Sequence, residues 1–206
     1  SKVATVKSVI NSADSLNKFF KNKKFKTFIL DAVNEWVDFE EEIKKKDIEI
    51  IYLNKKSIFN SLKKDGFIRS RLAYWYIFLK SFFPLIKILN KKKPDYLIIH
   101  LITSLPLILF IIKSFETKLV LRVSGFPKMT FFRKTLWMLA SRKIYKITCP
   151  TVDTYNDLSK FKFLKDKLHV LSDPILNIKE IQKIKKKEVI INQKIKQIIL
   201  KKKNIL

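Results

Sequence analysis

Glycine is nearly absent from this chain. Only Gly66 and Gly125 occur among 206 residues, whereas an average usage of roughly 7% would give about 14 glycines. Two glycines so far apart cannot supply the Gly-x-Gly-x-x-Gly turn of a dinucleotide site or the Walker loop that cradles phosphates. The scarcity excludes an ordinary dehydrogenase or nucleoside-triphosphatase. It also indicates that Gly125 is kept for a reason, either a positive φ angle or the close approach of a ligand.

Cysteine and histidine are also scarce. The single cysteine, Cys149, cannot form an internal disulfide, which excludes a disulfide scaffold and fits a reducing cytoplasm. Because it ends a mostly apolar run, we expect a buried core thiol. His100 and His169 have no cysteines or carboxylates at ligand spacing, so we expect no metal site. His169 lies inside a late predicted strand, and we expect it to be structural.

Acidic residues are heavily outnumbered. The chain has 44 Lys and Arg against 18 Asp and Glu, a formal net charge of +26. Such a charge indicates a phosphate-rich partner, either nucleic acid or an anionic membrane. The alternative is that abundant Lys, Ile, Asn and Phe reflect an AT-rich coding sequence. Arginine is rare among the basic residues, although its planar guanidinium group is the one that most often recognises a base by paired hydrogen bonds. We therefore expect no specific nucleic-acid partner.

We expect no signal peptide at the start of this sequence. Residues 1–20 lack the basic start and apolar core of a signal peptide. No initiator methionine opens the sequence, so we expect the amino terminus to be missing. The longest uncharged stretch, 96–112, is at the short limit for a membrane span and contains polar residues, so we expect a strand and a helix there.

Hydrophobic periodicity predicts alternating strands and helices. Strands are expected over residues 26–32, 47–53, 96–100, 118–123, 143–149 and 167–171. Helices are expected over residues 3–20, 35–46, 69–90 (kinked or interrupted at Pro84), 104–115, 129–141 and 151–160. This order predicts an α/β fold, a Rossmann-like parallel sheet with helices on both faces.

The predicted elements also suggest a domain boundary. We expect residues 1–176 to form the Rossmann-like domain, with its first strand missing because the chain opens on a helix. Residues 177–206 are expected to form a linker helix and the start of a truncated second domain. The linker helix would cover 178–200, and the next strand would begin at 201–206.

Polar residues follow two neighbouring predicted strands, where parallel sheets bind their ligands. His100 is a candidate base or a contact to a sugar hydroxyl or phosphate; the alternative is a structural histidine. Thr103 and Ser104 could cap the next helix or offer amides and hydroxyls to a ligand. The loop after the second strand could face a sugar or diphosphate, or could be a tight turn that merely needs glycine. The expected binding residues are His100, Thr103, Ser104, Ser124, Gly125 and Phe126.

The predicted helix over 69–90 is both aromatic and basic. It could lie in the surface of an anionic bilayer or pack on the sheet as an ordinary helix. Both alternatives hold if one face of the helix contacts the membrane and the other contacts the sheet. The residues expected to face the membrane are Arg71, Trp75, Lys80, Phe83 and Lys87. A second basic and aromatic cluster beside Gly125 comprises Phe131, Phe132, Arg133, Lys134 and Trp137.

Four segments, in order, resemble family-four glycosyltransferases. Lys93-Pro94-Asp95-Tyr96-Leu97-Ile98-Ile99-His100 is similar to their Lys-Pro-Asp strand ending in His, and 119–125 to their next strand, which ends before a glycine. Residues 144–151 resemble the strand that ends in Ser or Thr, and 167–175 the strand and exit that end in Asn-Pro. Ser124 departs from the pattern, because many relatives carry a histidine there that helps to bind the reacting groups.

The resemblance implies a two-domain GT-B fold. Its amino-terminal domain mainly binds the acceptor, and its carboxy-terminal domain binds the nucleotide-sugar. Residues 201–206 would then begin the second domain, and this chain by itself would transfer no sugar. The full protein would transfer a sugar to a hydroxyl of a glycan or lipid-linked acceptor, usually with retention, with His100 and Gly125 near that hydroxyl. We expect no resident cofactor or metal.

The implied setting is cell-surface polysaccharide synthesis, in the cytoplasm and peripherally on the inner face of the plasma membrane. The main alternative is a basic nucleic-acid- or membrane-binding α/β module without catalysis. Saturable, structure-selective binding would distinguish a true nucleic-acid module from the salt-dependent binding that charge alone produces.

Overall fold

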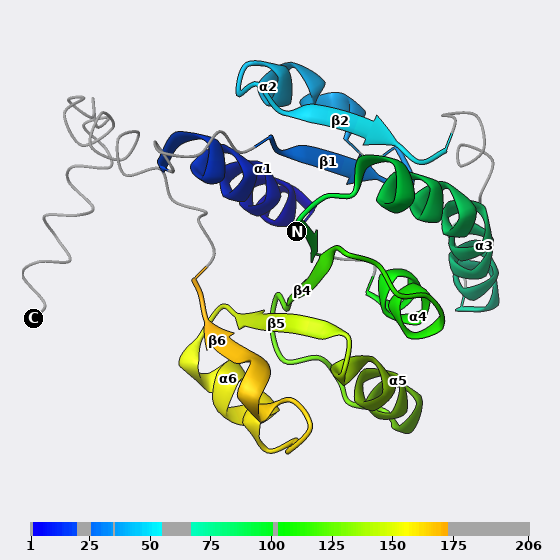
Figure 1. Ribbon diagram of the computed structural model, residues 1–206, viewed down its shortest axis with the longest axis vertical. Helices are drawn as coiled ribbons and strands as arrows, with labels where there is room; N and C mark the ends of the chain where they lie inside the picture. Colours follow the sequence, from blue (N-terminus) through cyan, green and yellow to red (C-terminus); the bar gives the residue numbers. More distant parts are fainter. Residues whose placement is uncertain (1, 20–25, 35, 55–66, 101–102, 173–206) are drawn as a thin grey trace, which may run out of the picture. The chain divides into compact units, whose positions relative to one another are not determined.

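The computed structural model describes residues 2–19, 26–34, 36–54, 67–100 and 103–172 (Figure 1). Of residues 2–5 and 67–71 it describes the backbone alone. The chain divides into two units, 1–173 and 174–206, so the described residues all belong to the first. The expected linker helix, the strand after it and the predicted boundary at residue 176 lie outside the described residues.

Strands and helices alternate along the chain, as the periodicity predicted. The strands are β1 (Phe28–Asp31), β2 (Glu49–Tyr52), β3 (Tyr96–Ile99), β4 (Lys118–Arg122), β5 (Ile144–Cys149) and β6 (Leu168–Val170). The α-helices are α1 (Lys2–Phe19), α2 (Glu40–Lys44), α3 (Phe67–Lys92), α4 (Ser104–Ile112), α5 (Phe131–Ser141) and α6 (Val152–Ser159). The stretch weighed as a membrane span is a strand followed by a helix, β3 and α4, which confirms that prediction.

All described strand pairs are parallel. Strands β3, β4, β5 and β6 form one sheet in that order, while β1 and β2 form a second sheet. The mixed α/β class with parallel strands is therefore confirmed, but the described strands are not joined into one sheet. A further parallel strand that paired with both β1 and β3 would unite them, so the first strand expected ahead of α1 stays a prediction.

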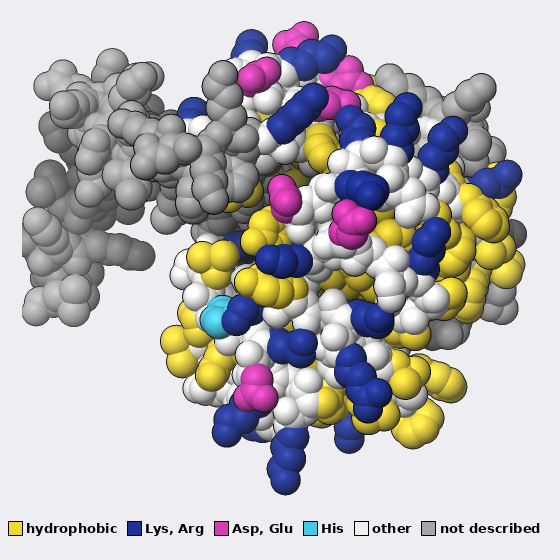
Figure 2. Space-filling model, in the orientation of Figure 1, with side chains coloured by type: hydrophobic (Ala, Val, Ile, Leu, Met, Phe, Trp, Pro, Cys, Tyr) yellow, Lys and Arg dark blue, Asp and Glu magenta, His cyan; other side chains and the backbone are white. Residues whose placement is uncertain are grey.

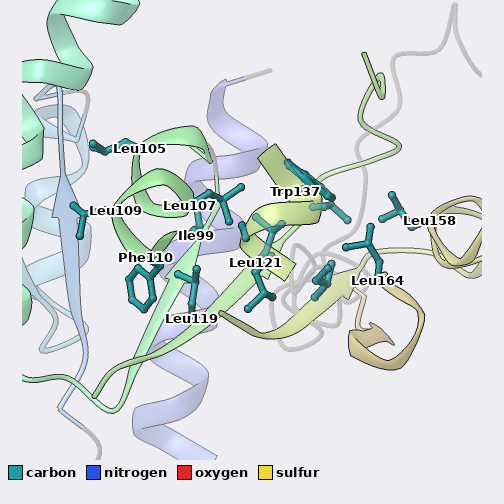
Figure 3. Packing of buried hydrophobic residues seen from close by; sticks show 14 of the residues in the cluster. Ile99, Leu105, Leu107, Leu109, Phe110, Leu119, Leu121, Trp137, Leu158 and Leu164 are labelled. Carbon is teal, nitrogen blue, oxygen red and sulfur yellow. The ribbon is translucent and has the colours of Figure 1, made fainter. Parts of the chain in front are cut away.

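The handedness of parallel crossovers decides which face each helix covers. Steps from β3 to β6 all run in one direction, so right-handed connections place α4, α5 and α6 on the same face. Their buried residues form one hydrophobic cluster with this sheet and with α3, including Ile99, Leu107, Leu121 and Trp137 (Figure 3). This cluster is the main core of the described chain.

A smaller cluster joins α1 and α2 to the first sheet. Ile10 of α1 and Ile43 of α2 are buried with Ile29 of β1, while the next residue, Leu30, packs against the main cluster. The sheet of β1 and β2 therefore has helices on both faces, as predicted.

The four-stranded sheet differs from that prediction. On its second face, Tyr96 of β3 and Tyr145 of β5 are exposed, their ring centroids 6.1 Å apart, with the Lys118 ammonium over both rings. Among the described residues no crossover runs back across β3 to β6, so no connection places a helix over these rings.

Two helices depart from their predicted form. Helix α3 runs through Pro84, which excludes the interruption and leaves the kink as the alternative that the structure does not contradict. Proline removes the amide that would bond the carbonyl of Lys80, but Lys80 lies on the exposed side of the helix, where water can bond that carbonyl. The helix predicted over 35–46 is a 3₁₀ turn (Val37–Phe39) followed by α2.

A buried carboxylate closes the end of β1. The Asp31 side chain is fully buried, and its two oxygens accept hydrogen bonds from the backbone amides of Val33 (3.0 Å) and Trp36 (3.1 Å). It thereby satisfies two amides of the turn that leaves the strand. Asp31 was not among the residues predicted to matter, although an acidic residue that ends an apolar strand is a typical sign of such a turn.

Candidate functional site

The predicted binding residues follow two strands that lie side by side. β3 and β4 are parallel neighbours, with Ile99 opposite Leu121. Their carboxyl ends therefore lie at the same edge of the sheet, called the carboxyl edge below. His100, Thr103 and Ser104 follow β3, and the loop that contains Ser124, Gly125 and Phe126 follows β4. The arrangement is the one in which parallel sheets place ligands.

The loop after β4 is open to solvent. Ser124, Gly125 and Phe126 are all exposed. The φ angle of Gly125 lies outside the left-handed region, and a Cβ atom added there would meet no atom within 4 Å. The fold of the described chain thus gives no reason for glycine at this position, and the tight-turn interpretation is wrong. The close approach of a ligand, the other reason considered for this glycine, stays a prediction.

Capping of α4 by Thr103 is not observed. Thr103 has helical backbone angles (φ −80°, ψ −38°) and makes no side-chain cap bond. Capping threonines have extended backbones that aim the hydroxyl at the first turn. Thr130 (ψ 161°) and Thr151 (ψ 160°) show this geometry, and their hydroxyls accept from the amides of Arg133 and Thr154. The capping prediction for Thr103 is therefore wrong.

The hydroxyl of Ser104 contacts a different helix. It is hydrogen-bonded to the Tyr74 hydroxyl of α3. Burial raises the pKa of Tyr74, while the positive charge of Arg133 on α5 acts in the opposite direction. Arg133 in turn donates to the carbonyl of Lys128 (2.8 Å) in the loop after β4. Helices α3, α4 and α5 thus meet beside the carboxyl edge, a junction that sequence reasoning missed.

A buried arginine also lies at this edge and was missed. Arg122 is the last residue of β4, is only 6% exposed, and donates from Nη2 to the carbonyl of Ser172 (3.2 Å) after β6. The bond ties the exit of β6 to the end of β4 across the intervening strand. The signal was present, because a single charged residue stands inside the apolar run 119–123. The guanidinium group therefore belongs to a residue of the carboxyl edge, two positions before Ser124.

The two histidines lie in different settings. His100 is half-buried directly after β3, at the carboxyl edge. His169 lies in β6 opposite Thr148 and is exposed. In the parts of the chain that the structure describes, no three His, Cys, Asp or Glu side chains gather in a way that could hold a metal ion.

The predicted membrane-facing residues lie on α3. Trp75, Lys80, Phe83 and Lys87 are exposed, whereas only the backbone of Arg71 is described. Residues 72–92 are long and apolar enough to cross a membrane by length and composition, and 28% of the most apolar window is buried. The other side of the helix is packed into the core, as the alternative of an ordinary packed helix predicted. The contact of the exposed side with a bilayer stays a prediction.

Cys149 is expected to resist thiol reagents while the chain is folded. It is fully buried, as predicted, and burial raises the pKa of its thiol to about 11 from an ordinary value of 9.0. Ellman-type labelling near pH 8 should detect no thiol in the native chain and the single cysteine after denaturation. Because the unfolded thiol ionises first, the free energy of unfolding should also fall as the pH rises from 9 toward 11. Rapid labelling of the native chain would contradict this burial.

Neither a known protein-family model nor a curated protein matches this chain. The carboxyl edge and the helices beside it are therefore the features of the chain that bear on its function.

Proposed function

We propose that this chain is the acceptor-side domain of a GT-B glycosyltransferase that transfers a sugar from a nucleotide-sugar to a hydroxyl of a glycan or lipid-linked acceptor. The observation that carries the proposal is Gly125, a glycine that the fold itself does not require, in an exposed loop at the carboxyl edge of a parallel sheet. In a sequence with two glycines, a position with open space and an ordinary backbone is best explained by a ligand that needs that space.

The candidate site contains groups suited to holding a hydroxylated acceptor. Thr103 contributes a hydroxyl that makes no capping bond, and the exposed backbone at Ser124 and Gly125 offers amides to a sugar or diphosphate. His100, half-buried after β3, is the residue on which we place the contact to the reacting hydroxyl. In the reaction, the acceptor oxygen bonds to the anomeric carbon and the bond from that carbon to the diphosphate breaks. The nucleoside diphosphate leaves, and the proton of the hydroxyl is released.

The donor would bind to a second domain and not to the described residues. The expected setting is the cytoplasmic face of the membrane at which cell-surface polysaccharides are built. No resident cofactor is part of this proposal, because the activated sugar itself carries the leaving group.

Replacing Gly125 with valine should lower kcat/KM of the full-length transferase by about tenfold or more, since branched bulk would fill the space kept for the acceptor. The melting temperature should stay nearly unchanged, because a Cβ at this exposed position meets no atom within 4 Å. Transfer is measured with a panel of nucleotide-sugars and lipid-linked acceptors. The 206-residue chain alone, which lacks the donor-binding domain in this proposal, is the negative control.

The control is Ser114→Val, which places the same valine side chain in an exposed loop at the opposite, amino-terminal end of β4 and removes only an exposed hydrogen bond from Lys143. It should leave kcat/KM within about twofold of the parent. A Gly125→Val enzyme with unchanged kcat/KM, or transfer by the 206-residue chain alone, would overturn the proposal.

A non-catalytic membrane-binding module is the second candidate. The exposed aromatic side chains of α3 favour it over a nucleic-acid module, because net charge alone does not explain apolar residues in solvent. Absence of transfer by the full-length protein under all donor and acceptor combinations would favour this candidate.

A further inference from the structure

Helix α3 has two apolar sides, and the described residues cover only one. Ser81, Leu85 and Leu89 are buried against the main core. On another side, large apolar side chains recur every three or four residues and are 59–74% exposed: Leu72, Trp75, Leu79 and Phe83. A surface helix of a soluble domain turns its apolar stripe toward the core. This second stripe therefore has the character of a binding surface.

A pair of phenylalanines adds a second apolar feature. Phe131 and Phe132, the first two residues of α5, are 78% and 84% exposed, with ring centroids 5.9 Å apart. In Figure 2, hydrophobic side chains gather over α3 at the right edge and again near α5, with Lys and Arg among them. Two adjacent phenylalanines in solvent, at the start of a helix, pack against little of their own chain.

Three side chains connect the two features. The Tyr74 hydroxyl on α3 bonds the Ser104 hydroxyl on α4, and Arg133 on α5 is close enough to act on the Tyr74 pKa. Arg133 directly follows Phe132. The α3 stripe and the phenylalanine pair thus flank one junction, which also adjoins the carboxyl edge. We name the four stripe residues and the pair together the docking surface.

The two helices that form the docking surface carry charged side chains of one sign. Helices α3 and α5 contain no acidic residue, whereas Lys80 and Lys87 accompany the stripe and Arg133 and Lys134 follow the pair. Apolar side chains surrounded by lysine and arginine match the interface of an anionic bilayer, whose headgroups attract the cations while its acyl region accepts the rings.

Two other occupants fit less well. A membrane-spanning α3 would have to withdraw Ser81, Leu85 and Leu89 from the core. A second copy of the chain would set Lys80, Lys87 and Arg133 against their own equivalents in a chain of net charge +26. An anionic bilayer accepts the exposed rings in its acyl region and attracts the cations to its headgroups.

We infer that α3 and the start of α5 dock the protein on an anionic phospholipid membrane, in the plane of the interface. The docking brings the carboxyl edge to the headgroup layer, where the diphosphate of a lipid-linked acceptor lies. That last step rests on the proposed transferase function, whereas membrane docking itself stands on exposure and charge alone.

The test is sedimentation of the 206-residue chain with vesicles of phosphatidylcholine alone or with about 30% phosphatidylglycerol. The parent chain should bind the anionic vesicles about tenfold more tightly than the neutral ones. Its tryptophan emission should shift to the blue on binding, because Trp75 is exposed while Trp36 and Trp137 are buried. Affinity that is indifferent to phosphatidylglycerol would overturn the inference.

Paired variants locate the surface. The double change Phe131→Ser with Phe132→Ser should weaken anionic vesicle binding by about tenfold, as should Leu79→Ser with Phe83→Ser. The matched control is Val152→Ser, which alters an apolar residue of similar exposure (59%) at the first position of α6. It should bind as the parent does, and circular dichroism should show that all variants are folded. Parent-like binding by both double variants would refute the docking surface.

A polyanion comparison separates membrane from nucleic acid. Heteropolymeric RNA should bind the parent and the Phe131→Ser, Phe132→Ser variant equally, because charge alone drives that binding. If the phenylalanine changes weaken RNA binding and spare vesicle binding, base stacking would explain the exposed rings and the inference would be wrong. Vesicle binding is measured without donor or acceptor, so its failure is distinct from a failure of the transferase proposal.

Discussion

Replacing Trp137 with alanine is expected to lower the free energy of unfolding by about 3–5 kcal/mol. Trp137 lies in α5, is 2% exposed, and belongs to the cluster that joins the helices to the four-stranded sheet (Figure 3). Truncation removes the largest apolar side chain of that helix from the core and leaves a cavity lined by residues that cannot collapse fully. Urea denaturation followed by circular dichroism measures the loss.

Leu139 provides the internal control for this prediction. It lies two residues further along the same helix and is 56% exposed. Leu139→Ala should change the free energy of unfolding by less than about 1 kcal/mol, because little apolar surface returns to water. Equal losses for the two variants would mean that α5 does not pack on the sheet through Trp137.

The positions of the strands were predictable because each is a short apolar run bounded by turn residues. A buried parallel strand shows such an apolar run whichever helices and strands pack against it. Consecutive strands joined by one helix are usually neighbours in the sheet, and the pairing of β3 with β4 confirms that step. What single residues do at the carboxyl edge was less predictable. Thr103 has the right chemistry for a cap but the wrong backbone angles, and side-chain type alone does not determine ψ.

Contacts between distant segments were beyond sequence reasoning. The Tyr74–Ser104 bond joins residues 30 positions apart, and the bond from Arg122 to Ser172 spans 50. Such pairs produce no repeating pattern in the amino-acid sequence, because they depend on the side-chain geometry at the ends of helices and strands. The exposed side of α3 was predicted only in part, because Trp75 and Phe83 were expected there but Leu72 and Leu79 were not. An apolar residue at helical spacing predicts burial, but spacing does not tell the core face from a second apolar face.

Asp31→Ala is the second substitution expected to have a large effect, lowering the free energy of unfolding by about 2–4 kcal/mol. The carboxylate is fully buried and accepts from the amides of Val33 and Trp36, and bonds to a charged acceptor are the stronger kind. Alanine leaves both amides without that acceptor. Asp31→Asn keeps one carbonyl oxygen and should lose about half as much.

The measurement pairs denaturation with hydrogen exchange, because Asp31 closes the turn after β1 and not the main core. Exchange should accelerate first in β1 and β2, while β4 and β5 stay protected. Asp38→Ala, an exposed carboxylate in the next turn, should change the free energy of unfolding by less than about 0.5 kcal/mol. If Asp31→Ala unfolds at the same urea concentration as the parent, the two amides find other acceptors. The end of β1 would then be held by the packing of Ile29 and Trp36 rather than by its carboxylate.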